Sequence, residues 1–161
     1  MSDTLHRAEL EFLMLGTKLG EGMSRSVYVY KDPAHWGRMR SDHALAYLDD
    51  ESQLVIKVEK PGGQYQNVQE WSVWEYVKSD PAMKKWLAPC VAISPCGLYL
   101  IQHRVEPIRK AEMPKFLPAF LQDVVRDNLG KYDGRVVCCD YGMGVAAVRT
   151  ASRRMKRVRP Q

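Results

Sequence analysis

Three oxygen-bearing side chains occur at spacings that could serve metal-assisted chemistry. Asp123 precedes Asn128 by five positions, and Asp140 follows Asn128 by twelve, directly after the apolar run 136–139. A carboxylate at a strand end with a glycine two residues behind it is well placed to hold Mg²⁺, and an asparagine carbonyl can share the metal. Asp123, one loop away, could orient a hydroxyl and accept its proton. The adjacent Asp127 could replace either Asp123 or Asn128.

A lysine and a glutamate form a second candidate pair. Lys57 follows the apolar triplet 54–56 on a predicted central strand, where its side chain points inward or into a cleft. A buried ammonium is costly without a partner, and Glu70 on the next predicted helix is the natural candidate. Such a pair could hold a lysine against nucleotide phosphates. The alternative is a lysine that extends from a strand edge into solvent.

Two glycines, Gly20 and Gly22, stand between two predicted strands. Glycine there allows a tight turn whose N–H groups can approach phosphates, although an ordinary hairpin also uses glycine. A strand and not a helix follows the turn, so the pattern is not the dinucleotide-binding fingerprint.

The elements that must position these residues follow from hydrophobic periodicity and from glycine and proline. In the helix over 66–79, apolar residues at 68, 71, 73, 74 and 77 predict a buried face, with Glu70 off its centre. We expect residues 32–53 to form a long connection that contains a short helix at 42–48. The remaining expected elements are helical character over 4–15, two strands within 17–32, a strand over 53–60, two strands within 88–107, a helix over 114–125 that runs into a loop, and a strand over 134–142 after an Asp133-Gly134 turn.

Composition limits the possible classes of protein. The 161-residue chain is 45% hydrophobic, enough to bury a core in one domain or in one domain with two small lobes. It has no run of 18 uncharged apolar residues, and its start lacks the apolar segment of a signal peptide, so we expect no membrane contact and a cytoplasmic protein. The four cysteines form no C-x-x-C pair, and the four histidines are scattered, so the usual zinc spacings are absent.

Basic residues gather at the C-terminal end. Residues 149–161 hold six of the 24 Lys and Arg residues and no acidic residue, which leaves 18 basic and 19 acidic residues in 1–148. Such a tail could contact nucleic acid or an acidic partner. The alternative is a solvated, disordered terminus.

The order of these motifs resembles the protein-kinase-like superfamily. The resemblance covers roughly residues 12–145 and rests on Gly20-x-Gly22 with Val27, then Val55-Ile56-Lys57, a helix glutamate, Asp123-x4-Asn128, and Asp140-Tyr141-Gly142. It implies an α+β fold in three parts. Residues 1–105 would form a kinase-like N-lobe, with an antiparallel sheet and one helix, together with the hinge. Residues 106–148 would form a much reduced C-terminal lobe, and residues 149–161 the basic tail. Compact kinase-like proteins of this type are familiar from bacteriophage genomes.

The resemblance also implies roles for individual residues, with ATP and Mg²⁺ as cofactors. Lys57, paired with Glu70, would contact the α- and β-phosphates; Asp123 would be the catalytic aspartate; Asn128 and Asp140 would bind Mg²⁺. Gly20, Gly22 and Val27 would cover the nucleotide, Gln102 would stand at the back of the adenine pocket, and His103 to Val105 would present hinge backbone groups to adenine.

The chain also departs from the kinase pattern. Arg25 replaces the third glycine of the loop, where it would help or block phosphate binding. Leu121-Gln122 replace the usual His-Arg, and Val125 stands where a lysine is expected. Little sequence after Gly142 could form an activation segment or a platform for a protein substrate.

These observations leave three functions open. The first is a minimal ATP/Mg-dependent phosphotransferase resembling Ser/Thr protein kinases. The second is a catalytically weak or inactive pseudokinase-like module that binds a partner protein. The third is a small α+β domain unrelated to kinases that uses its basic tail on nucleic acid.

Overall fold

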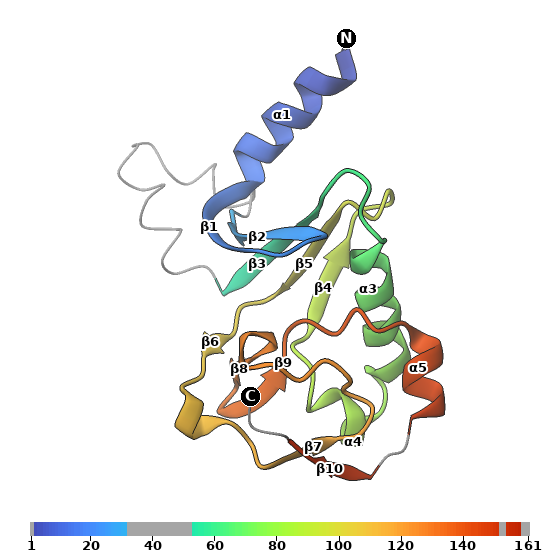
Figure 1. Ribbon diagram of the computed structural model, residues 1–161. Helices are drawn as coiled ribbons and strands as arrows, with labels where there is room; N and C mark the ends of the chain where they lie inside the picture. The colour runs from blue at the N-terminus through green and yellow to red at the C-terminus, as the bar shows by residue number, and fades with distance from the viewer. Residues whose placement is uncertain (1, 32–52, 152–153, 159–161) are drawn as a thin grey trace.

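A five-stranded antiparallel sheet dominates the N-terminal part of the computed structural model, which describes residues 2–31, 53–151 and 154–158 (Figure 1). Its order is β1-β2-β3-β5-β4. The strands are β1 Leu15–Glu21, β2 Arg25–Tyr30, β3 Leu54–Glu59, β4 Cys90–Ile93 and β5 Tyr99–His103, and helix α3 (Gln66–Val77) follows β3. The fold is therefore α+β with a mostly antiparallel sheet, as the sequence predicts at this coarse level.

The N-terminal helix and the glycine turns also follow the sequence pattern. Helix α1 (Ser2–Met14) precedes β1 and extends away from the sheet (Figure 1). The turn between β4 and β5 contains Gly97, whose φ of 72° lies in the left-handed region that glycine adopts without strain. No helix in the described part of the chain is long and apolar enough to cross a bilayer.

The C-terminal part consists of short elements. Strands β6 (Glu106–Pro107), β8 (Leu129–Tyr132) and β9 (Arg135–Cys138) form a three-stranded sheet of order β6-β8-β9. Asp133 and Gly134 join β8 to β9 with φ values of 50° and 71°, the geometry of a tight hairpin turn, which confirms the predicted turn. Besides α1 and α3, the helical elements of the described residues are α4 (Pro81–Lys84), η2 (Lys110–Glu112), η3 (Arg126–Asn128) and α5 (Val145–Thr150).

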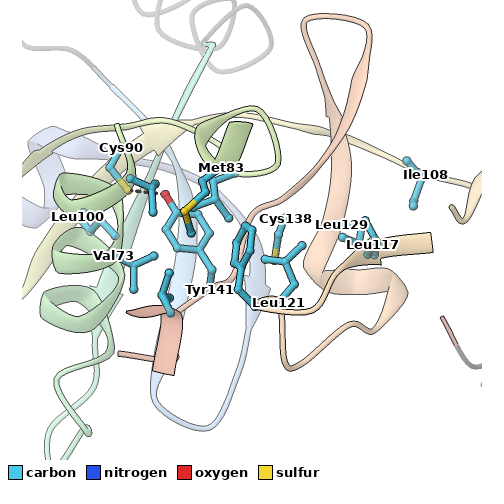
Figure 2. Packing of buried hydrophobic residues seen from close by; sticks show 14 residues of the cluster. Val73, Met83, Cys90, Leu100, Ile108, Leu117, Leu121, Leu129, Cys138 and Tyr141 are labelled. Atoms are coloured by element: carbon cyan, nitrogen blue, oxygen red, sulfur yellow. Dashed lines mark hydrogen bonds between the residues drawn. The ribbon is translucent and has the colours of Figure 1, made fainter. Parts of the chain in front are cut away.

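One hydrophobic cluster joins the two parts of the chain. Val73 of α3 and Leu100 of β5 belong to the same cluster as Leu117, Cys138 and Tyr141 (Figure 2). Burial of these apolar side chains fixes α3 and the strand end at 138–141 against a shared core, and apolar burial contributes about 25 cal/mol per Å². The core thus fixes the relative positions of the segments that carry the predicted site residues.

The helix predicted over 114–125 is wrong. Phe116–Pro118 form strand β7, and residues 121–125 have no regular structure. Pro118 explains the difference, because a proline inside a helix removes a backbone donor and clashes with the preceding turn. Leu117 and Leu121 are nevertheless buried, so the apolar pattern correctly marks core positions although the period was misread.

The view of the tail as a disordered terminus is also wrong for its described part. Met155–Arg157 form strand β10, which pairs antiparallel with β7. The flanking backbone bonds from Ala119 N to Arg154 O (2.8 Å) and from Val158 N to Lys115 O (3.0 Å) extend the pairing. A tail of apparently solvated charges is thereby part of the fold. The expected connection over 32–53, with its helix at 42–48, lies outside the described residues except for Gln53.

Candidate functional site

Both parts of the chain line one cavity of about 640 Å³. This volume is within the range of small-molecule sites in proteins, about 300–1,000 Å³. The predicted site residues that line it are Gly22, Val27, Lys57, Gln102, His103, Val105, Asp123, Asn128 and Asp140. Glu70 and Gly20 are not in the wall, but Glu70 contacts three residues that are, and Gly20 pairs with Val27 in the β1–β2 register.

Strand register places the polar residues of the sheet on one face. Val27 pairs with Lys57, Lys57 with Leu100, and Val55 with Gln102. Directly paired residues share a face, and side chains alternate along each strand with a period of two. Arg25, two residues before Val27, therefore projects on the same face as Lys57 and Gln102.

Glu70 is the centre of a buried hydrogen-bond network. Its Oε1 accepts from Lys57 Nζ and from Gln102 Nε2, both at 2.7 Å, and its Oε2 accepts from Arg25 Nη1 at 2.6 Å. Glu70 is 0% exposed and Lys57 is 4% exposed. The predicted Lys57–Glu70 ion pair is thus confirmed, and the buried charges compensate one another as buried charges must.

The predicted face of α3 needs correction. The buried residues of the helix are Asn67, Glu70, Val73 and Val77, whereas Val68 is exposed. The sequence prediction assigns only apolar residues to this face, so it sets Glu70 off the centre of the face and does not include Asn67. Their hydrogen-bond partners on β3 and β5 make that burial possible.

Two residues missed by sequence reasoning fix the start of α3. Both carboxylate oxygens of Glu59 accept from the helix, one from Gln66 N and one from Asn67 N, each at 3.1 Å. A carboxylate there satisfies free N–H groups and complements the helix dipole. The Asn67 side chain donates to Lys57 O at 3.1 Å and to Leu98 O at 2.9 Å. These bonds position the helix independently of Glu70.

Arg25 joins Glu70 to Asp140. Its Nη1 lies 2.6 Å from Glu70 Oε2 and 3.2 Å from Asn67 Oδ1, and its Nη2 lies 2.6 Å from Asp140 Oδ1. Arg25 is only 6% exposed. Burial lowers the pKa of the guanidinium, but the charges of Glu70 and Asp140 outweigh that effect and raise it. Sequence reasoning placed Arg25 near phosphates and missed this double ion pair.

The end of β9 brings Asp140 to the cavity. Lys57 Nζ donates to Cys139 O, and Cys139 N donates to Asn128 O at 2.8 Å. On the other side, the buried Tyr141 hydroxyl donates to Ala88 O at 2.6 Å. These bonds hold the backbone on both sides of Asp140, so the carboxylate projects from a fixed point while remaining 49% exposed.

Asp123 and Asn128 form a local pair in the cavity wall. Asn128 Nδ2 donates to Asp123 O at 3.1 Å and to Asp123 Oδ2 at 3.2 Å. Because the Asn128 side chain donates to Asp123 through Nδ2, its own amide oxygen Oδ1 remains available as an acceptor. Asp127, the open alternative, does not line the cavity, and its side chain is 83% exposed. The geometry thus brings Asp123 and Asn128 together and leaves Asp127 outside.

The predicted hinge, residues 103–105, also lines the cavity. His103 N donates to Pro89 O at 2.9 Å, and Arg104 N donates to Gln53 O at 2.8 Å. Within the described residues, Val105 N has no such acceptor. Val105 is therefore the hinge residue whose backbone donor is available to a ligand. Burial lowers the pKa of His103, which favours the neutral imidazole in this part of the wall.

The residues present fit a nucleotide and a divalent cation to different extents. The wall contains the apolar residues Val27 and Val55 beside the cations Arg25 and Lys57, which suits a base and phosphates. The described residues contain no group of three His, Cys, Asp or Glu side chains that could hold a metal. Mg²⁺ is commonly bound by one or two carboxylates together with substrate phosphates, so Asp140 and the Asn128 carbonyl are a sufficient protein contribution.

Comparison with known proteins adds no family assignment: the chain matches no protein-family model, and none of the curated proteins matches it.

Proposed function

We propose that this chain is a minimal ATP- and Mg²⁺-dependent phosphotransferase, similar in its site to Ser/Thr protein kinases. The observation that carries the proposal is the convergence of Lys57, Asp123, Asn128 and Asp140 on one cavity from distant parts of the sequence. Their order along the chain has the kinase-like pattern described above. An antiparallel sheet with a Lys57–Glu70 ion pair behind it supports the finer interpretation of the fold as a kinase-like N-lobe with a reduced C-terminal lobe.

The phosphates would lie at the cationic end of the cavity. Lys57 is held by Glu70 and by Cys139 O, so its ammonium is fixed before a ligand binds. Phosphoryl transfer asks a protein mainly for positioning and for compensation of charge. Mg²⁺, when bound by Asn128 and Asp140, would neutralise negative charge on the phosphates. Gly22 and Val27 would cover the nucleotide from the β1–β2 side.

The base would lie at the hinge end. Val105 N offers a donor there, and Val27 and Val55 offer apolar surface. Gln102 is buried and donates to Glu70, so at the back of the pocket it orients the glutamate as well as limiting the depth of the site.

Asp123 would accept the proton of the attacking hydroxyl. Its carboxylate receives a hydrogen bond from Asn128 at 3.2 Å, which fixes its orientation. A positioned general base typically contributes about 10²–10⁴-fold to rate. Val125 also lines the cavity, where it provides no positive charge for the transferred group, so we expect slow turnover.

One observation favours a second candidate, a pseudokinase-like module that binds nucleotide and a partner protein without transferring phosphate. Arg25 occupies Oδ1 of Asp140 at 2.6 Å, so one of the proposed metal-binding oxygens already has a cationic partner. A site in this state could hold a ligand and lack catalysis.

A labelling experiment separates the two candidates. The protein is incubated with Mg²⁺ and γ-labelled ATP, alone and with cell lysate, and compared with Asp123→Asn and with the matched control Asp127→Asn. Transfer that Asp123→Asn reduces about 10²-fold or more, and that Asp127→Asn leaves unchanged, supports the enzyme. Thermal stabilisation by ATP without transfer supports the binding module. The absence of both effects refutes a nucleotide site.

A further inference from the structure

Arg25 is a buried cation at the end of the cavity that the proposed function assigns to phosphates and Mg²⁺. It reaches this place because it pairs with Glu59 in the β2–β3 register and shares the inward face with Lys57. Two carboxylates and one amide hold it, each through the bonds described above. It therefore forms a fixed part of the cavity wall.

The guanidinium retains donors that no described residue uses. A guanidinium carries five N–H groups. Arg25 donates three hydrogen bonds, two from Nη1 and one from Nη2. This leaves the Nε–H and one Nη2–H without an acceptor in the described part of the chain. Buried N–H groups are rarely left unpaired, and Arg25 lines the cavity, so a ligand acceptor is the simplest partner.

Lys57 adds a further N–H donor beside the guanidinium of Arg25. An ammonium has three N–H groups, and the bonds to Glu70 and to Cys139 O use two of them. Arg25 and Lys57 share Glu70 as an acceptor, one on each of its oxygens. The two cations are thus fixed next to each other with donors in excess, which is the arrangement that binds phosphate oxygens.

We propose that the cavity binds the triphosphate of a nucleotide without a divalent cation, because Arg25 and Lys57 offer fixed N–H donors to the phosphate oxygens. This inference rests on the proposed nucleotide site and concerns binding, not transfer. If a metal were required for binding, it would compete with the guanidinium for Asp140 and disrupt a buried ion pair. A planar guanidinium that already faces the phosphates removes that requirement.

The test is isothermal titration of the full chain with ATP, once in MgCl₂ and once in EDTA. We expect dissociation constants that agree within about threefold between the two conditions, since the cationic donors belong to the protein. Arg25→Gln should weaken binding in EDTA by about tenfold or more, and Arg25→Lys by less, because a point charge replaces the fork. The matched control is Lys78→Gln, an exposed cation that pairs with Glu75 and does not line the cavity.

Two probes locate the effect within the ligand. Inorganic tripolyphosphate in EDTA should lose affinity in Arg25→Gln to the same extent as ATP, whereas adenosine should bind both proteins equally. Circular dichroism and thermal unfolding check that the variant folds; if it does not, the comparison of MgCl₂ with EDTA on the unaltered chain still decides.

Each outcome has a definite meaning. ATP binding that requires Mg²⁺ overturns this inference and leaves the proposed function standing. Equal affinity of Arg25→Gln and the unaltered chain in EDTA overturns it as well. If ATP binds neither in MgCl₂ nor in EDTA, both the inference and the proposed function are overturned.

Discussion

Glu70→Gln is the substitution that tests the buried charge network most directly. Glu70 accepts three charge-assisted or amide hydrogen bonds and is completely buried. A glutamine at this position removes the negative charge and turns one acceptor into a donor that faces other donors. Arg25 and Lys57 then remain buried with Asp140 as the nearest compensating charge.

The magnitude follows from burial. Removal of one partner from a buried ion pair costs about 3–5 kcal/mol, because the remaining charge is buried without compensation. For a chain of this length, 1 kcal/mol shifts the melting temperature by about 2–4 °C. We therefore expect Glu70→Gln to lower the melting temperature by about 10 °C. The corresponding loss of about 3–5 kcal/mol is a large part of the free energy of unfolding of a typical domain, which is about 5–15 kcal/mol.

The assays are thermal unfolding and urea unfolding, both followed by circular dichroism, with Glu75→Gln as the matched control. Glu75 lies on the same helix, and its side chain is 40% exposed and pairs with Lys78. An exposed pair of this kind contributes about 0–1 kcal/mol. The same chemical change thus tests a buried and an exposed site within one helix.

A comparable loss of stability in Glu70→Gln and Glu75→Gln would refute the reasoning, since burial would then have no effect. The double variant Lys57→Met/Glu70→Gln adds a second criterion. The two changes should be non-additive by at least about 0.5 kcal/mol, as expected for residues in contact. Strict additivity would show that the ion pair does not contribute to folding.

Three other perturbations test separate parts of the structure. Gly130→Ala should destabilise the fold by about 1–3 kcal/mol in urea unfolding, because a Cβ at this position would lie 2.6 Å from Val105 Cβ. The control Gly20→Ala places its Cβ where no atom lies within 4 Å, so it should be tolerated. Equal effects of the two substitutions would contradict the packing of β8 against the hinge. Deletion of residues 154–161 should lower the melting temperature by several degrees, because β7 loses its partner strand β10. An unchanged melting temperature would indicate that the tail is solvated and does not contribute to the fold. With iodoacetamide at pH 8, Cys96 should be alkylated first, because it is exposed and a hydrogen bond from Ser94 lowers its pKa. Burial raises the pKa of Cys139 to about 11, so this thiol should react more slowly. Mass spectrometry that finds Cys139 labelled before Cys96 would contradict this prediction.

Much of the sheet could be predicted because its local signals agree with one another. Alternating valines, glycine turns and the Asp133-Gly134 pair each indicate a single structure, and the structure follows them. The Lys57–Glu70 pair could be predicted for a different reason: a lysine at the end of an apolar strand requires a compensating charge, and few acidic residues lie within reach.

The errors arise where the decisive interaction is distant in sequence. Apolar residues over 114–125 fit a helix when the segment is considered alone, but Pro118 and pairing with β10 make it a strand. The role of Arg25 depends on Asp140, 115 residues later. No local pattern could reveal that contact, because the sequence shows which charge must be compensated but not which of several partners will reach it.

The location of the buried charges distinguishes a functional from a purely structural interpretation. Replacement of a buried ion pair by apolar residues of similar volume is often neutral or stabilising, so stability alone does not explain why Arg25 and Lys57 stand in this wall. Positioning of α3 does not explain them either, because Glu59 and Asn67 already anchor the start of that helix to β3 and to Leu98. What the charges add is a set of fixed N–H donors at one end of a cavity large enough for a nucleotide. The anion-binding site proposed above would explain why these residues are buried here despite the energetic cost of burying charges.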